Sequence, residues 1–126
     1  MNRHEQRKKI FQLLFQIDHD AVSIKNASFY DLYNQQDYIK STVDYFLNHK
    51  ETVDNEISAH LKNYTLERIS KVERNILRMA VSEINVADAP VRVIINEAVK
   101  VSKLYGENDS FRFVNGVLKN FADKNG

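Results

Sequence analysis

Aromatic and basic side chains share one flank of the helix expected at the start of the chain. At 100° per residue, His4, Lys8, Phe11 and Phe15 form a narrow stripe beside the apolar face. An outward aromatic ring near a cation suits unpaired nucleotides, because the ring stacks on a base while the cation contacts phosphate. The stripe predicts a surface for single-stranded nucleic acid. The alternative is that Phe15 packs under the segment after Asp20 and that the basic residues only face solvent.

A second basic face lies on the helix expected after Pro90. Its polar side carries Arg92, Asn96, Lys100 and Lys103, opposite an apolar stripe. This face either extends a surface for phosphates or is simply solvated, and the sequence leaves both interpretations open.

Charged residues on the helix expected from Ser70 need partners elsewhere in the fold. Arg74 and Arg78 are four residues apart, so they repel each other mildly unless an anion or carboxylate lies nearby. Glu73 points toward the apolar side of the same helix, and it either completes the cap on Ser70 or has a further role.

Gly116 stands in the middle of the last expected helix, where glycine costs about 1 kcal/mol relative to alanine. We therefore expect another group to approach Gly116 closely. That group is either a neighbouring helix of the core or the backbone of a ligand.

The chain offers little for catalysis or for metal binding. It has no cysteine and only three glycines, which excludes thiolate zinc sites and the glycine-rich loops that bind phosphates. His49 and His60 are eleven residues apart, so on one straight helix they stand about 16 Å apart, too far to share an ion. We expect no catalytic residue, no metal site, no cofactor and no enzymatic activity.

Length and composition indicate one globular domain. The 126 residues are 43% hydrophobic and 28% charged, with a net charge of +1, which excludes a disordered chain. Basic residues dominate the first seventeen positions and acidic residues the middle of the chain. No apolar run is long enough to cross a membrane, and the start lacks the apolar segment of a signal peptide, so we expect a cytoplasmic protein that does not contact a membrane.

The spacing of apolar residues and helix caps predicts an all-α fold of about six or seven helices. One proline and few glycines disfavour a turn-rich β fold. We expect residues 1–126 to form one domain of two packed helical halves, about 1–64 and 65–126. The first two expected helices cover residues 3–19 and 28–34, and a long third one starts at Tyr38 and breaks near residues 49–51. A fourth helix starts at Ser70, and a fifth is opened by Asp88 and closed by Gly106. The last helix runs from Asp109 or Ser110 to about Phe121.

Three motifs in the second half resemble the NusB family of transcription antitermination factors. They occur in the family's order, with its separations. They are VERNILRMA at residues 72–80, Pro90 followed by INEAV at 95–99, and DSFRFVNGVL at 109–118. The resemblance covers the whole chain, more loosely over the first 60 residues, and it implies two small helical bundles packed together.

The resemblance implies a non-enzymatic RNA-binding protein. Such a protein binds single-stranded boxA RNA together with the small-subunit ribosomal protein NusE and helps to load an antitermination complex on RNA polymerase. Its partner-binding positions match Glu73 and Asp109 here. The RNA-binding positions expected from the stripe and from the family together are Arg3, His4, Arg7, Lys8, Phe15, Tyr64, Arg112 and Phe113.

The chain departs from the family pattern in its first fifteen residues. Glu5 interrupts the basic segment, His4 stands where arginine is common, and Phe15 stands where tyrosine is frequent. These differences predict weak, salt-sensitive binding of RNA by the chain alone. The alternative function is a helical protein adaptor, or a homodimer when free, that does not bind RNA.

Overall fold

The computed structural model describes the backbone of residues 1–125 and the side chains as far as Ala122. The described residues form seven α-helices and one short 3₁₀ turn without a strand, which confirms the predicted all-α fold. In chain order these elements are α1 (Arg3–Asp20), η1 (Ile24–Asn26), α2 (Tyr30–Gln35), α3 (Asp37–Asn48), α4 (Lys50–Ser58), α5 (Lys71–Val86), α6 (Val91–Tyr105) and α7 (Ser110–Asn125).

Local capping explains where several helices begin. The Asn2 side chain accepts a hydrogen bond from the Glu5 amide at the start of α1, and the Ser70 hydroxyl accepts one from the Glu73 amide at the start of α5, as the spacing predicts. Pro90 directly precedes the first residue of α6, so the expectation of Asp88 at this position was wrong by two residues. Proline suits a helix start because it lacks the amide hydrogen that would be unpaired there.

The long apolar segment from Tyr38 is divided into α3 and α4. The backbone leaves the helical region at His49, with φ −131° and ψ 29°, which confirms the expected break. Gln36 similarly separates α2 from α3 in an extended conformation. These breaks let the segment change direction and cover two sides of α5.

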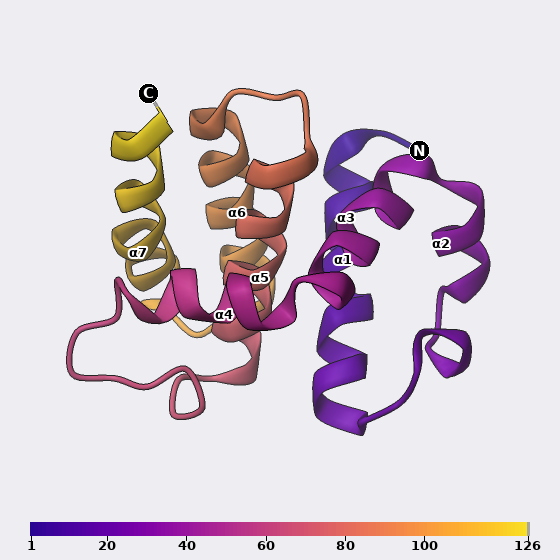
Figure 1. Cartoon of the computed structure of the whole chain (residues 1–126), viewed down its shortest axis with the longest axis horizontal. Helices are drawn as coiled ribbons and strands as arrows, with labels where there is room; N and C mark the ends of the chain where they lie inside the picture. Colours follow the sequence, from indigo (N-terminus) through magenta and orange to yellow (C-terminus); the bar gives the residue numbers. More distant parts are fainter. Residues whose placement is uncertain (126) are drawn as a thin grey trace.

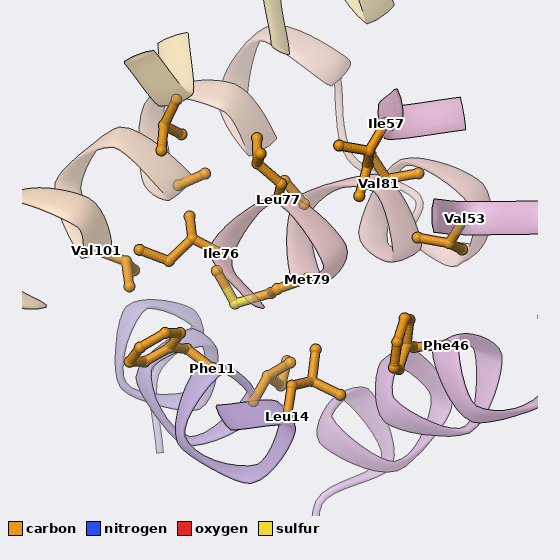
Figure 2. Close-up of a cluster of buried hydrophobic side chains, with 14 of the residues drawn as sticks. Phe11, Leu14, Phe46, Val53, Ile57, Ile76, Leu77, Met79, Val81 and Val101 are labelled. Carbon is orange, nitrogen blue, oxygen red and sulfur yellow. The ribbon is translucent and has the colours of Figure 1, made fainter. Parts of the chain in front are cut away.

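Helix α5 lies at the centre of the molecule. Figure 1 shows α1, α2 and α3 on one side and α6 and α7 on the other, with α4 crossing α5 from the end of α3 toward α7. Figure 2 shows Phe11 and Leu14 of α1 and Phe46 of α3 on the side of α5 that carries Met79, and Val101 of α6 lies in the same cluster. The core is therefore continuous from α1 to α7 through α5.

Two aspartates neutralise the arginine pair of α5. Asp18 accepts from Arg74 at 2.8 Å and lies 3.5 Å from Arg78, while Arg78 also makes a two-pronged pair with Asp54 at 2.8 and 2.9 Å. Partial burial of Asp18 acts to raise its pKa, but hydrogen bonds from Asn75 and Arg74 outweigh burial and hold the pKa below its usual value. The carboxylates that the sequence required therefore come from α1 and α4, and they fix both helices to α5.

Candidate nucleic-acid interface

The predicted site residues lie in two separate regions of the molecule. One region is the first two turns of α1 and the other is the start of α7, on opposite sides of the central helix α5 (Figure 1). The second half of α1 carries Phe15, about 18 Å along the helix axis from Arg3. The first region holds Arg3, His4, Arg7 and Lys8, and the second holds Tyr64, Glu73, Asp109, Arg112 and Phe113.

Arg7 is buried and points into the protein. Its side chain is 4% exposed, and its Nε donates to Glu83 Oε1 at 2.7 Å. The Tyr38 hydroxyl donates to the same carboxylate oxygen. Burial raises the pKa of Glu83, although the positive charge of Arg7 and the hydrogen bond from Tyr38 oppose that rise. The expectation that Arg7 contacts phosphate does not fit this placement, because its guanidinium joins α1 to α5 inside the fold.

The other basic residues of α1 differ in whether a carboxylate already pairs with them. His4 Nδ1 lies 3.3 Å from Glu97 Oε2 of α6, and Lys8 pairs with Glu5 at 3.0 Å. Arg3 is exposed, and its guanidinium carbon lies 3.6 Å from the centre of the Tyr38 ring. Within the described side chains, Arg3 has no carboxylate within the 4 Å of an ion pair. Of this group, Arg3 is the cation best placed to meet an incoming phosphate.

The stripe on α1 runs along α6 and does not face open solvent. Phe11 lies 4.9 Å from the Tyr105 ring, and Phe15 is half-buried between Phe11 at 5.9 Å and a stacked His19 at 5.3 Å. The predicted outward ring is therefore partly covered, because α6 and the segment after α1 cover this flank, as the alternative interpretation of Phe15 anticipated.

Phe15 lines an apolar pocket that the sequence did not reveal. The pocket, called here the aromatic pocket, has a volume of about 370 Å³ and is formed mainly by Phe11, Phe15, Phe29, Val72 and Tyr105. Phe29 holds a left-handed backbone conformation with φ 72°, which is strained for a bulky residue. No sequence signal brings Tyr105 and Phe29 together at this place.

Exposed aromatic and charged groups gather at the start of α7. Tyr64, in the segment between α4 and α5, is 59% exposed and meets the Phe113 ring edge-on at 6.0 Å. Arg112 and Asp109 form an exposed pair at 3.3 Å one turn away. Tyr64, from the segment before α5, thus meets predicted residues at the start of α7.

Glu73 joins this surface from α5. Its Oε2 accepts from the Ser110 hydroxyl at 2.8 Å, which ties the first turn of α5 to the first turn of α7. This contact is the further role that the sequence left open for Glu73. Together with Tyr64, Asp109 and Phe113, Glu73 lines an open hollow of about 470 Å³, called here the Tyr64 hollow.

Gly116 has no close neighbour among the described residues, so a neighbouring helix of the core, the first of its two expected explanations, was wrong. A Cβ atom built on it meets no atom within 4 Å outside its local helix. Gly116 lies on the outward side of α7, where the neighbouring helices do not reach.

The described residues offer no site for metal chemistry and no membrane span. No group of three metal-binding side chains comes together in the described part of the chain. None of the described helices combines the length and the apolar character needed to cross a bilayer.

Comparison with known proteins assigns the chain to a family. The model of the NusB family matches residues 4–123. The transcription antitermination protein NusB of Oceanobacillus iheyensis is 41% identical, with 94% of this chain and 96% of that protein covered, and NusB of Listeria welshimeri is 38% identical, with 97% of each covered.

Solved structures agree with this assignment. NusB of T. maritima superposes with a TM-score of 0.81 at 26% identity over 98% of this chain and 92% of that one. A chain from the crystal structure of antitermination factors NusB and NusE in complex with dsRNA superposes with a TM-score of 0.78 at 28% identity over 98% and 99% of the two chains. On this agreement of sequence motifs, helical architecture and nearly full-length similarity, the chain belongs to the NusB family of transcription antitermination proteins.

Proposed function

We propose that this chain is a non-enzymatic antitermination adaptor that binds boxA-type single-stranded RNA together with NusE. The complex then joins the antitermination machinery on RNA polymerase. Support comes from the surface at the start of α7 and from the solved complex of NusB, NusE and dsRNA, whose NusB fold this chain shares.

The exposed Tyr64 ring supports the first part of this proposal, the binding of RNA. A tyrosine that is 59% exposed stabilises little by burial, yet its position is fixed by edge contact with Phe113. An exposed ring held by this edge contact presents a stacking face to a base. Arg112, the residue before Phe113, adds a cation on the neighbouring side of α7, where its guanidinium lies against the Phe111 ring. Arg3, at the start of α1 in the other region, offers a second cation for RNA.

The aromatic pocket supports the second part of this proposal, the binding of NusE. Its lining is almost wholly apolar, and the strained Phe29 at its rim is held with Lys9 Nζ 4.1 Å from the ring centre. Strain of this kind costs about 1–3 kcal/mol and concentrates at functional sites. An apolar side chain of a protein fits this pocket as the anchor of an interface. We therefore propose that Phe15 contacts NusE. Glu73, which the resemblance assigns to partner binding, is the next residue after Val72 of this pocket.

Substitution of Tyr64 tests the first part, the binding of RNA. Tyr64→Ala is expected to weaken binding of boxA-type RNA by about 1–3 kcal/mol, because one stacking ring is lost, whereas Tyr64→Phe keeps the ring and binds nearly as well. Fluorescence anisotropy at fixed salt with NusE present measures both variants.

The same assay tests the rival function. A protein adaptor or homodimer without RNA binding predicts that wild type and both variants show no binding of single-stranded RNA. Equal RNA affinity of wild type and Tyr64→Ala would remove stacking from the proposal. Circular dichroism controls for helicity, which is expected to be unchanged.

A further inference from the structure

Gly116 is a glycine that the fold itself does not require. Glycine within a helix costs about 1 kcal/mol relative to alanine. The backbone at Gly116 is helical and a Cβ atom would meet no atom within 4 Å beyond the local helix, so an alanine fits there without strain. Since no close packing of the described chain explains the glycine, a group outside the chain is the remaining candidate for its close approach.

Gly116 lies where two surface hollows meet. One, called here the α7 flank, lies beside Tyr64 and Phe113. The other, called here the α6–α7 groove, has a volume of about 470 Å³ and lies between the paired helices α6 and α7. Both hollows are lined by Gly116 and Lys119.

The same surface continues into the Tyr64 hollow. Tyr64 and Phe113 line both that hollow and the α7 flank. A path therefore leads from the exposed Tyr64 ring across the bare backbone of Gly116 into the α6–α7 groove. From Phe113 to Lys119 it follows about 9 Å of the α7 axis.

The α6–α7 groove is positively charged and contains an aromatic ring. Lys103 Nζ lies 4.9 Å and the Arg112 guanidinium carbon 5.4 Å from the centre of the Phe111 ring. Lys103 and Lys119 are exposed, and within the described side chains neither has a carboxylate within 4 Å. The pair of Arg112 with Asp109 is highly exposed and contributes little.

This chemistry favours a nucleic-acid strand over a protein surface. Unpaired lysines attract phosphates, a ring offers a face to a base, and a helix without a side chain lets a sugar–phosphate backbone come close. A protein segment would instead need carboxylates placed at the spacing of the lysines to match this charge.

We propose that single-stranded RNA bound at Tyr64 continues directly over Gly116 into the α6–α7 groove, where Lys103 and Lys119 contact its phosphates. This inference rests on the proposed RNA binding and extends it from Tyr64 to Gly116, Lys103 and Lys119. Gly116 acts here by allowing close approach, and the two lysines act by charge.

Gly116→Ala separates this role from a structural one. The alanine is expected to leave the thermal unfolding midpoint unchanged or to raise it, because it improves helix propensity in open space. Affinity for RNA that spans both hollows is expected to fall about fivefold or more, while affinity for NusE stays unchanged. A stabilised variant that binds RNA more weakly cannot be explained by damage to the fold.

Charge variants test the groove independently. Lys103→Gln and Lys119→Gln are each expected to lower RNA affinity two- to threefold at low salt and to reduce the salt slope by about one counterion. Lys100→Gln is the matched control, because Lys100 lies on the same helix but is 3.5 Å from Glu97 and outside the groove.

The outcomes distinguish failure of this path from failure of RNA binding as a whole. If Gly116→Ala and both lysine variants bind RNA like wild type while Tyr64→Ala binds weakly, the path ends at Tyr64 and the inference is overturned. If Tyr64→Ala also binds like wild type, the proposed function fails first. Loss of NusE affinity in Gly116→Ala, with RNA affinity intact, assigns the surface to a protein and likewise overturns the inference.

Discussion

Burial decides what each arginine and lysine of α1 can do. Arg7 and Arg3 are four residues apart, yet Arg7 is paired inside the fold with Glu83 and Arg3 lies on the surface against Tyr38. Helical spacing places Arg7 at the border between the stripe and the core face, but the spacing cannot reveal that a glutamate of α5 lies opposite. The acid is 76 residues away in the chain.

Removal of Arg7 is expected to destabilise the protein. Arg7→Ala leaves Glu83 buried without its cation, which costs about 3–5 kcal/mol in comparable buried pairs. Arg3→Ala is the control and is expected to change the free energy of unfolding by less than about 1 kcal/mol, because its ring contact is exposed. Urea unfolding followed by circular dichroism measures both.

The opposite pattern would restore the phosphate role of Arg7. An Arg7→Ala variant as stable as wild type, with a flatter salt dependence of RNA binding, would show that the pair with Glu83 is not maintained in solution.

The sequence predicts where helices begin and end more reliably than it predicts which helices pack against each other. Apolar spacing and the Ser70 cap predicted α1, α5 and the break at His49, because these depend on residues close in the chain. The expected start at Asp88 was wrong, since Pro90 itself precedes the first helical residue. The need for carboxylates near Arg74 was also predictable, but not that α1 supplies one.

Contacts between distant helices explain the remaining differences. The flank of α1 that carries Phe15 looks exposed on a helical wheel, but α6 lies along it and the segment with Phe29 closes it. Tyr64 and Phe113 were predicted from the resemblance, and the structure brings them together. Their shared role in RNA binding stays a prediction.

The Asp18 cluster is expected to make stability depend on pH at acid values. Because the pKa of Asp18 is lower in the folded protein than in the unfolded chain, the unfolded chain binds more protons as pH falls. Its stabilising contribution is therefore complete above the ordinary aspartate pKa of about 3.9 and is lost as pH falls through the lowered folded value.

Asp18→Asn tests this dependence. The variant lacks the titrating group, so its free energy of unfolding is expected to be lower than that of wild type at neutral pH and to fall less steeply between about pH 5 and pH 2. Denaturant unfolding at a series of pH values measures the difference. Parallel curves for the two proteins would show that Asp18 does not titrate differently on folding.

The whole molecule presents its two proposed binding sites next to each other. The aromatic pocket contains Val72 and the Tyr64 hollow contains Glu73, the next residue of α5. A protein bound in the pocket therefore lies beside RNA bound at Tyr64, and each can contact the other. We expect the two ligands to bind cooperatively, which by linkage must hold in both directions.

A titration of boxA-type RNA at several fixed concentrations of NusE tests this claim most directly. RNA affinity of the wild type is expected to rise with NusE and reach a plateau. Phe15→Ala is expected to need more NusE for the same plateau, while Tyr64→Ala binds RNA more weakly at every NusE concentration. RNA affinity that does not change with NusE, or a Phe15→Ala curve identical to that of wild type, would contradict the account.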